Sequence, residues 1–96
     1  MKNLTCDDIR QTLKNGATLL DVRSVDEFNR GALPQATNIP LALLPVIAHE
    51  QLDKNKPVHV YCQAGGRATM AEKILLNPGF DSITNIGGIE HYPNCH

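Results

Sequence analysis

Short apolar runs alternate with amphipathic segments along the chain, and polar or glycine-containing turns separate them. Four apolar runs have the length of strands buried in a parallel sheet: 17–22, 36–39, 58–61 and 80–86. Four further segments carry apolar residues at helical spacing or helix-capping residues: 5–15, 24–31, 45–52 and 68–76. Strands that alternate with helices in so short a chain predict an α/β layered structure with a mostly parallel sheet.

Capping residues mark where several of these helices should begin. Thr5 precedes two acidic residues, as expected for an N-cap followed by an acidic first turn. Ser24 has Glu27 three residues later, which is the capping-box pattern. Pro45 suits the first position of the third helix. In the last helix the spacing predicts an apolar face made of Met70, Ala71, Ile74 and Leu75.

Composition limits the classes of function. The chain has 96 residues, of which 42% are hydrophobic and 20% charged, so residues 1–96 are expected to form one globular domain. Nine basic and ten acidic side chains give a net charge of −1. This balance argues against general binding to nucleic acid or to an anionic membrane. The longest apolar run, residues 39–48, contains two prolines and is too short to cross a membrane.

Cysteine usage bears on the compartment. Cys6, Cys62 and Cys95 are odd in number and far apart, a pattern that does not suggest a disulfide framework. The first residues lead directly into acidic sequence and contain no apolar segment of the secretory type. A reducing, cytoplasmic location with one reactive thiol is therefore the prediction.

The segment 58–68 carries the most specific chemistry. A β-rich run ends at Tyr61, Cys62 follows, and Gly65, Gly66 and Arg67 lead into a helical pattern. This order would place a thiolate at the tip of a strand and beneath the N-terminus of a helix, where free backbone N–H groups and the helix dipole favour negative charge. Cys62 is predicted to be a nucleophile rather than a core cysteine.

Four stretches, taken together, resemble the rhodanese family of sulfurtransferases, specifically its small single-domain members. They are Leu19–Arg23 with Glu27–Phe28, Gly31–Pro40, Tyr61–Ala68, and Gly79–Phe80 with Ile86–Ile89. They follow the family's order over nearly the whole chain. The resemblance implies a three-layer fold with a mainly parallel five-stranded sheet and helices on both faces.

The resemblance also implies persulfide chemistry that needs no cofactor. A Cys62 thiolate would take the sulfane sulfur of a donor such as thiosulfate or a persulfide and pass it to cyanide or a thiol. The partners would be small molecules of these kinds or proteins that carry sulfur. Glycines allow successive N–H groups to converge on an anion, so the loop should bind substrate. Its substrate-binding residues would be Gln63, Ala64, Gly65, Gly66 and Arg67.

The chain departs from the family pattern in three places. Ala32 and Gln35 stand where the family often has His and Gly, and Tyr92 stands where Trp is frequent. More important for chemistry, Gln63 follows the cysteine, where a cation is common. With Arg67 as the one remaining loop cation, a dianionic donor such as thiosulfate is expected to bind less well than a persulfide.

Other polar residues are better explained by structure than by catalysis. Asp21, Arg23, Glu27 and Arg30 are predicted to form a charge cluster, in which the first three support the loops. His59 alternates with valines in the central strand and should be a packed histidine.

The C-terminal segment contains a possible ligand set. His91, Cys95 and His96 lie within six residues, but their spacing is not that of a structural zinc site, so no metal is predicted. Cys95 could alternatively resolve a persulfide or form a disulfide with Cys62. This is the less favoured interpretation, because sequence gives no distance between the two residues.

Three other functions remain open at this point. Phosphatases and arsenate reductases of the cysteine-loop type share the thiolate-plus-arginine arrangement, but they place five residues between the two, whereas four separate Cys62 from Arg67. A non-catalytic rhodanese-like binding module usually lacks the cysteine. Simple disulfide exchange would favour a Cys-x-x-Cys pair, which the chain lacks.

Overall fold

The computed structural model describes residues 4–76, 78–93 and 95. Helices and strands alternate along the chain, as the apolar pattern predicts. The α-helices are α1 (Cys6–Lys14), α2 (Val25–Asn29), α3 (Leu44–Gln51) and α4 (Gly66–Leu76). The strands are β1 (Thr18–Asp21), β2 (Thr37–Asn38), β3 (Val58–Cys62) and β4 (Ile83–Gly88). Two short 3₁₀ helices complete the set: η1 (Leu41–Leu43) and η2 (Ile89–His91).

The strands form one parallel sheet in the order β2-β1-β3-β4. The described residues contain four strands, so the five-stranded sheet implied by the family resemblance is not found in them. Because all pairings are parallel, the carboxyl ends of the strands meet at one edge. Asp21 pairs with Tyr61, and Cys62 pairs with Gly88. This edge is where open parallel sheets bind ligands.

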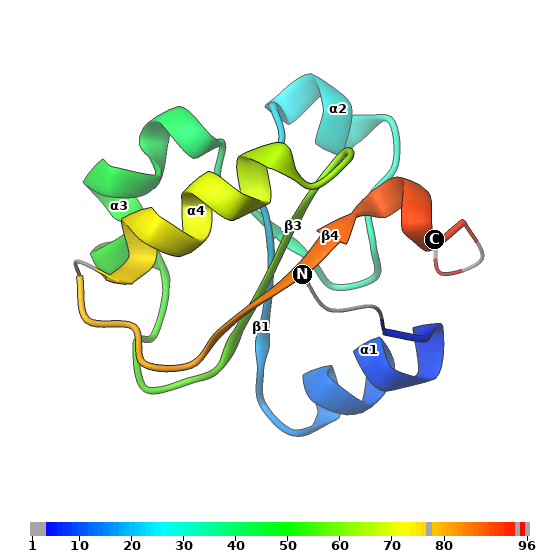
Figure 1. Cartoon of the computed structure of the whole chain (residues 1–96), viewed down its shortest axis with the longest axis horizontal. Coiled ribbons are helices and arrows are strands. Elements are labelled where there is room, and N and C mark those ends of the chain that lie inside the picture. The colour runs from blue at the N-terminus through cyan, green and yellow to red at the C-terminus, as the bar shows by residue number, and fades with distance from the viewer. Residues whose placement is uncertain (1–3, 77, 94, 96) are drawn as a thin grey trace.

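Helices cover both faces of the sheet (Figure 1). α3 and α4 lie on one face and enclose a core that includes Leu20, Val58, Val60, Leu75 and Phe80. α1 and the C-terminal segment cover the other face. The second core on this face includes Ile9, Leu19, Leu33, Tyr61 and Ile86. Alternation along β3 points Val58, Val60 and Cys62 to the first face and Tyr61 to the second. The nucleophile predicted from the sequence therefore faces α4.

The predicted helix starts are largely confirmed. The predicted capping box between Ser24 and Glu27 forms, and Thr5, predicted as an N-cap, forms a second box with Asp8. Pro45 occupies the second position of α3, because the helix begins at Leu44.

The predicted apolar face of the last helix is wrong in one residue. Met70 is 57% exposed, while Ala68, Ala71 and Leu75 are buried. The helix begins at Gly66, two residues before the predicted start, and its buried residues are Ala68, Ala71 and Leu75.

A disulfide joins Cys6, at the start of α1, to Cys95 in the C-terminal segment. Their Cα atoms are 5.4 Å apart, and Cys62 remains the free cysteine. The expectation of unpaired cysteines is therefore wrong for two of the three, and the alternative Cys62–Cys95 bond is excluded. Disulfides persist mainly in oxidising compartments, so the cytoplasmic location stays a prediction with less support from cysteine usage. Among the described residues, no helix is long and apolar enough to cross a membrane.

Candidate active site

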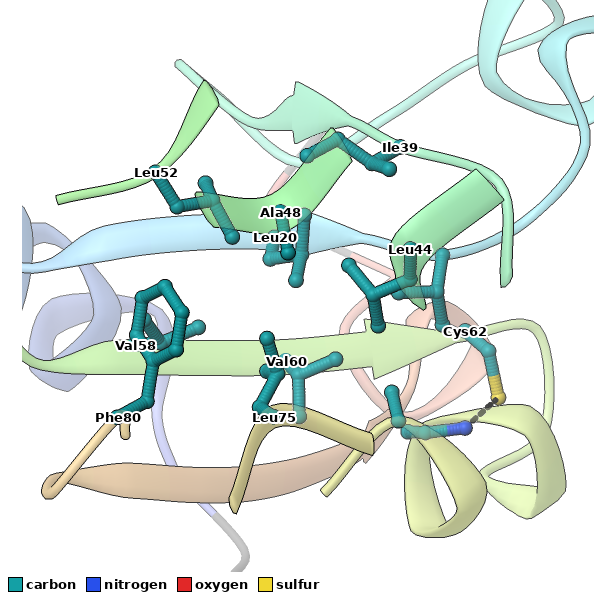
Figure 2. Close-up of a cluster of buried hydrophobic side chains, with 13 residues drawn as sticks. Leu20, Ile39, Leu44, Ala48, Leu52, Val58, Val60, Cys62, Leu75 and Phe80 are labelled. Carbon is teal, nitrogen blue, oxygen red and sulfur yellow. Dashed lines mark hydrogen bonds between the residues drawn. The ribbon is translucent and has the colours of Figure 1, made fainter. Parts of the chain in front are cut away.

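Cys62 is the last residue of β3 and is 1% exposed. Its Sγ accepts hydrogen bonds from the backbone N–H groups of Gly65, at 2.9 Å, and Ala68, at 3.4 Å. Figure 2 shows Cys62 at the end of the row of apolar side chains along β3. The dashed line is the hydrogen bond from the Ala68 N–H group to Sγ. Two N–H donors in a buried setting form a site for a thiolate.

The local backbone explains how the two donors reach the sulfur. Gly65 has a φ of +117°, which side-chain-bearing residues rarely adopt, and this turn aims its N–H back at Cys62. α4 begins at the next residue, Gly66, so Ala68 is in the first turn, where N–H groups have no partner within the helix. Sequence reasoning placed the donors within residues 63–67 and missed Ala68. Ala68 was missed because the sequence pattern predicted that the helix begins at residue 68, whereas it begins at Gly66.

The end of β4 supports the cysteine loop from the other side. Tyr61 pairs with Gly87 although Val60 pairs with Asn85, so the register shifts by one residue next to the site. Gly88 lies so close to the loop that a Cβ there would sit 2.6 Å from Ala64 Cα and would also collide with the carbonyl oxygen of Gln63. Glycine at position 88 is thus required for the loop to lie against the sheet edge.

A series of side-chain hydrogen bonds that runs from β4 to α4 also holds the cysteine loop. Asn85 is buried and donates through Nδ2 to Thr69 Oγ1 at 3.1 Å and to Glu72 Oε1 at 3.0 Å. The Thr69 hydroxyl in turn donates to the Gly65 carbonyl at 3.1 Å. Asn85 was not predicted to have a role, since nothing in the sequence places it near residues 65–69.

Asp21 and Arg23 form a buried ion pair at the end of β1. Arg23 Nη2 lies 2.7 Å from Asp21 Oδ2, and its Nε contacts both carboxylate oxygens. Burial lowers the pKa of Arg23, but the hydrogen bond and charge of Asp21 outweigh this effect, and the pKa is raised. The remaining donors bind Gln63 Oε1, at 3.2 Å, and the Gly31 carbonyl, at 2.7 Å. Arg23 therefore connects β1, the segment after α2 and the cysteine loop.

Arg67 and Glu27 form a second ion pair across the site. The two guanidinium nitrogens donate to the two carboxylate oxygens, at 2.6 Å and 2.9 Å. Hydrogen bonds from Arg67 hold the pKa of Glu27 at about 2, although partial burial acts in the opposite direction. The pKa of Arg67 is raised, first by its hydrogen bond to Glu27 and also by the nearby charges of Glu27 and Cys62. The charge of Arg67 interacts with Cys62 and is paired with Glu27, and its predicted contact with substrate stays a prediction.

A pocket of about 480 Å³ opens beside the cysteine loop. Its lining residues come from three segments of the chain: Arg23, Glu27, Arg30, Gly31, Gln63 and Ile89. A hollow of similar size, about 490 Å³, lies against α3 and α4 and is lined by residues such as His49 and Lys73. Neither hollow is lined by Cys62 itself, which is buried, but only the first is lined by a residue of the cysteine loop, Gln63, so this pocket is the candidate active site.

Several sequence predictions fall outside this site. Ala64 is exposed at the loop tip, and its predicted contact with substrate stays a prediction. His59 lies in β3, half-buried. Of the C-terminal ligand set, Cys95 is bonded to Cys6, and His96 lies outside the described residues.

Comparison with known proteins now defines the class. The rhodanese-like domain family matches residues 5–94, and the chain belongs to this family. YqhL of Bacillus subtilis, described as uncharacterized, is 38% identical over 88 residues, which are 92% of this chain and 68% of that protein. The thiosulfate sulfurtransferase PspE of Escherichia coli is 36% identical over 72 residues, covering 74% of this chain and 69% of PspE.

The fold agrees with solved structures of the same class. A structure described as a rhodanese with anions, from E. coli, superimposes with a TM-score of 0.75 at 30% identity. The match covers 81% of this chain and 93% of the other. The α/β rhodanese fold inferred from the four sequence stretches is thus confirmed.

Proposed function

We propose that the protein is a sulfurtransferase that carries sulfur as a persulfide on Cys62. The observation that carries this proposal is the pair of N–H donors, from Gly65 and Ala68, on a free and buried sulfur. Such donors stabilise the thiolate before attack and the terminal sulfur anion afterwards. Kinship with sulfurtransferases at 31% and 36% identity supports the same reaction class.

With thiosulfate as donor, the Cys62 thiolate attacks the outer, sulfane sulfur. A new S–S bond forms at Cys62, the S–S bond of thiosulfate breaks, and its electron pair leaves with sulfite. One negative charge stays on the persulfide and two depart on sulfite, so charge is conserved. Cyanide or a thiolate then takes the outer sulfur and restores the Cys62 thiolate. The two half-reactions predict ping-pong kinetics.

Thiosulfate or a small persulfide is the proposed donor class, and a protein partner could deliver sulfur to the same thiol. The relative PspE is named as a thiosulfate sulfurtransferase, and the E. coli rhodanese structure is described as containing anions. A phosphatase is the weaker alternative. Four residues separate Cys62 from Arg67, and the N–H groups of Gly65, at 2.9 Å, and of Ala68, at 3.4 Å, form a cradle around one sulfur atom.

Intact-mass analysis after donor treatment tests the proposal. Wild-type protein should gain the mass of one sulfur atom with thiosulfate or a persulfide and lose it when cyanide is added. Cys62→Ala should gain nothing, whereas a Cys6→Ser/Cys95→Ser protein should still be loaded, because its free thiol is intact. No gain with any sulfane donor would refute the proposal. Hydrolysis of an aryl phosphate by the wild type but not by Cys62→Ser would favour the phosphatase.

A further inference from the structure

We propose that Arg30 is the donor-binding cation of this site and that it selects doubly charged donors such as thiosulfate over singly charged ones. Arg30 ends α2 and lines the same pocket as Gln63, the residue after Cys62. This inference rests on the proposed sulfur transfer and assigns the recognition step to a residue outside the cysteine loop.

The charges around the pocket identify Arg30. Two arginines line it, Arg23 and Arg30, and a third, Arg67, is bonded to the lining residue Glu27. Arg23 is paired with Asp21, so both Arg23 and Arg67 have carboxylate partners. Arg30 forms no ion pair with a carboxylate in the part of the chain that the structure describes. One positive charge is therefore left over at the pocket, and it belongs to the arginine that is most free to meet a ligand.

Neither ion pair is easily given up to a ligand. Arg23 is 3% exposed, and its carboxylate partner is fully buried, so separating the two would leave an uncompensated buried charge. Arg67 makes two short bonds to Glu27. Arg30 is exposed, and no carboxylate among the described residues forms an ion pair with its guanidinium.

Gln63 supplies a neutral donor beside this cation. Its Oε1 accepts from Arg23 Nη1 at 3.2 Å, which fixes the orientation of the amide. The Nε2 group, with two N–H donors, is then left for a ligand in the pocket. Gln63 and Arg30 together can bind the oxygens of a sulfonate-type group, and this places the outer sulfur beside the cysteine loop, because Gln63 directly follows Cys62.

Arg30 has an alternative explanation as a helix-capping residue. Cations are favourable at the C-terminus of a helix, and Arg30 is the C-cap of α2. α2 has only five residues, however, so its dipole is small. A capping role predicts a change in stability, whereas donor binding predicts a change in KM for charged donors.

Two donors with the same reacting S–S bond separate these roles: thiosulfate, a dianion, and methanethiosulfonate, a monoanion. In each case Cys62 gains the sulfane sulfur, and sulfite or methanesulfinate leaves with the electron pair. Arg30→Ala should raise KM for thiosulfate by on the order of 10-fold and that for methanethiosulfonate clearly less, with kcat little changed. Arg30→Lys should recover most of the affinity, and Arg30→Glu should lose more.

Arg10→Ala is the matched control, because it removes one exposed arginine on α1, away from the pocket. It should leave both KM values unchanged. Equal KM values for Arg30→Ala and wild type with thiosulfate would overturn the role of Arg30 while leaving Cys62 loading, and hence the proposed function, intact. A KM increase of the same size with both donors would also overturn it. If Cys62 is never loaded in the wild type, the proposed function itself fails.

Discussion

Arg67 and Glu27 lie 40 residues apart in sequence and meet face to face, with nitrogen–oxygen distances of 2.6 Å and 2.9 Å. Glu27 also closes the capping box of α2 through Ser24, and Arg67 belongs to the first turn of α4. The pair therefore ties the start of one helix to the start of another on either side of the thiol. Glu27 offsets the unfavourable position of a cation at a helix N-terminus.

This ion pair should make the free energy of unfolding depend on pH in the acidic range. The pKa of Glu27 is lowered from 4.5 to about 2 in the folded protein, so the folded state binds this proton less readily than the unfolded state. The stabilisation is complete above pH 4.5 and is lost as the pH falls towards 2. We expect a loss of about 1 kcal/mol in the free energy of unfolding, because solvent screens the pair. Urea titrations at several pH values measure it.

Glu27→Gln is the control for this prediction. It keeps the shape of the side chain and removes the titrating group, so its unfolding free energy should fall less than that of the wild type between pH 4.5 and 2. Identical pH profiles for the two proteins would show that Glu27 does not carry the effect.

Gly88→Ala should disturb the cysteine loop. The added Cβ would sit 2.6 Å from Ala64 Cα, against backbone rather than a flexible side chain, so the loop or β4 must move. We expect a loss of about 1–3 kcal/mol in stability, as for other overpacked sites. Displacement of the loop would also move Gly65 relative to Cys62, so persulfide formation should slow by at least about 10-fold on the scale of lost oxyanion donors.

Gly66→Ala separates this collision from the general effect of adding a methyl group. Apart from its chain neighbours and the backbone of its own helix, no described atom lies within 4 Å of a Cβ at position 66, and the residue begins α4. Its stability should stay the same or rise by up to about 1 kcal/mol. Equal stability and equal loading rates for Gly88→Ala and wild type would contradict the close approach.

The Cys6–Cys95 bond should contribute strongly to stability. It closes a loop with a sequence separation of 89, so it restricts the unfolded chain over nearly its whole length. Reduction, or the Cys6→Ser/Cys95→Ser double variant, should lower the free energy of unfolding by about 2–4 kcal/mol. Chemical denaturation with and without a reductant measures the difference.

Thiol counting provides the check on that bond. Denatured protein without reductant should take up one alkyl group, on Cys62, and reduced protein should take up three. Three alkyl groups in both samples would rule out the disulfide. An effect of reductant on the stability of the double variant would point to a different cause.

The sequence predicted the parts of this molecule that depend on local pattern. Ser24 and Glu27 are three residues apart, so their capping box could be inferred without any tertiary contact. The position of Cys62 between a strand and a glycine-led helix start likewise predicted a sulfur near N–H donors, and two such bonds are present. Four short motifs in order were enough to indicate the fold.

What could not be predicted depends on residues that are far apart in sequence. Nothing in the pattern showed that Cys6 forms a disulfide with Cys95 or that Glu27 forms an ion pair with Arg67. Met70 had the right spacing for a buried residue, but α4 packs through Ala68, Ala71 and Leu75 and leaves it exposed. These outcomes follow from how the helices are placed on the sheet, and a one-dimensional periodicity does not contain that placement.

The bond between Cys6 and Cys95 also gives the chain a circular connectivity. Every described strand and all of the candidate active site lie inside this covalent ring. A single break in an exposed loop such as 53–57 would open the ring without producing two separate molecules. The two fragments, one bearing β1 and the other bearing Cys62, would remain joined and could keep the sheet edge that holds the sulfur together.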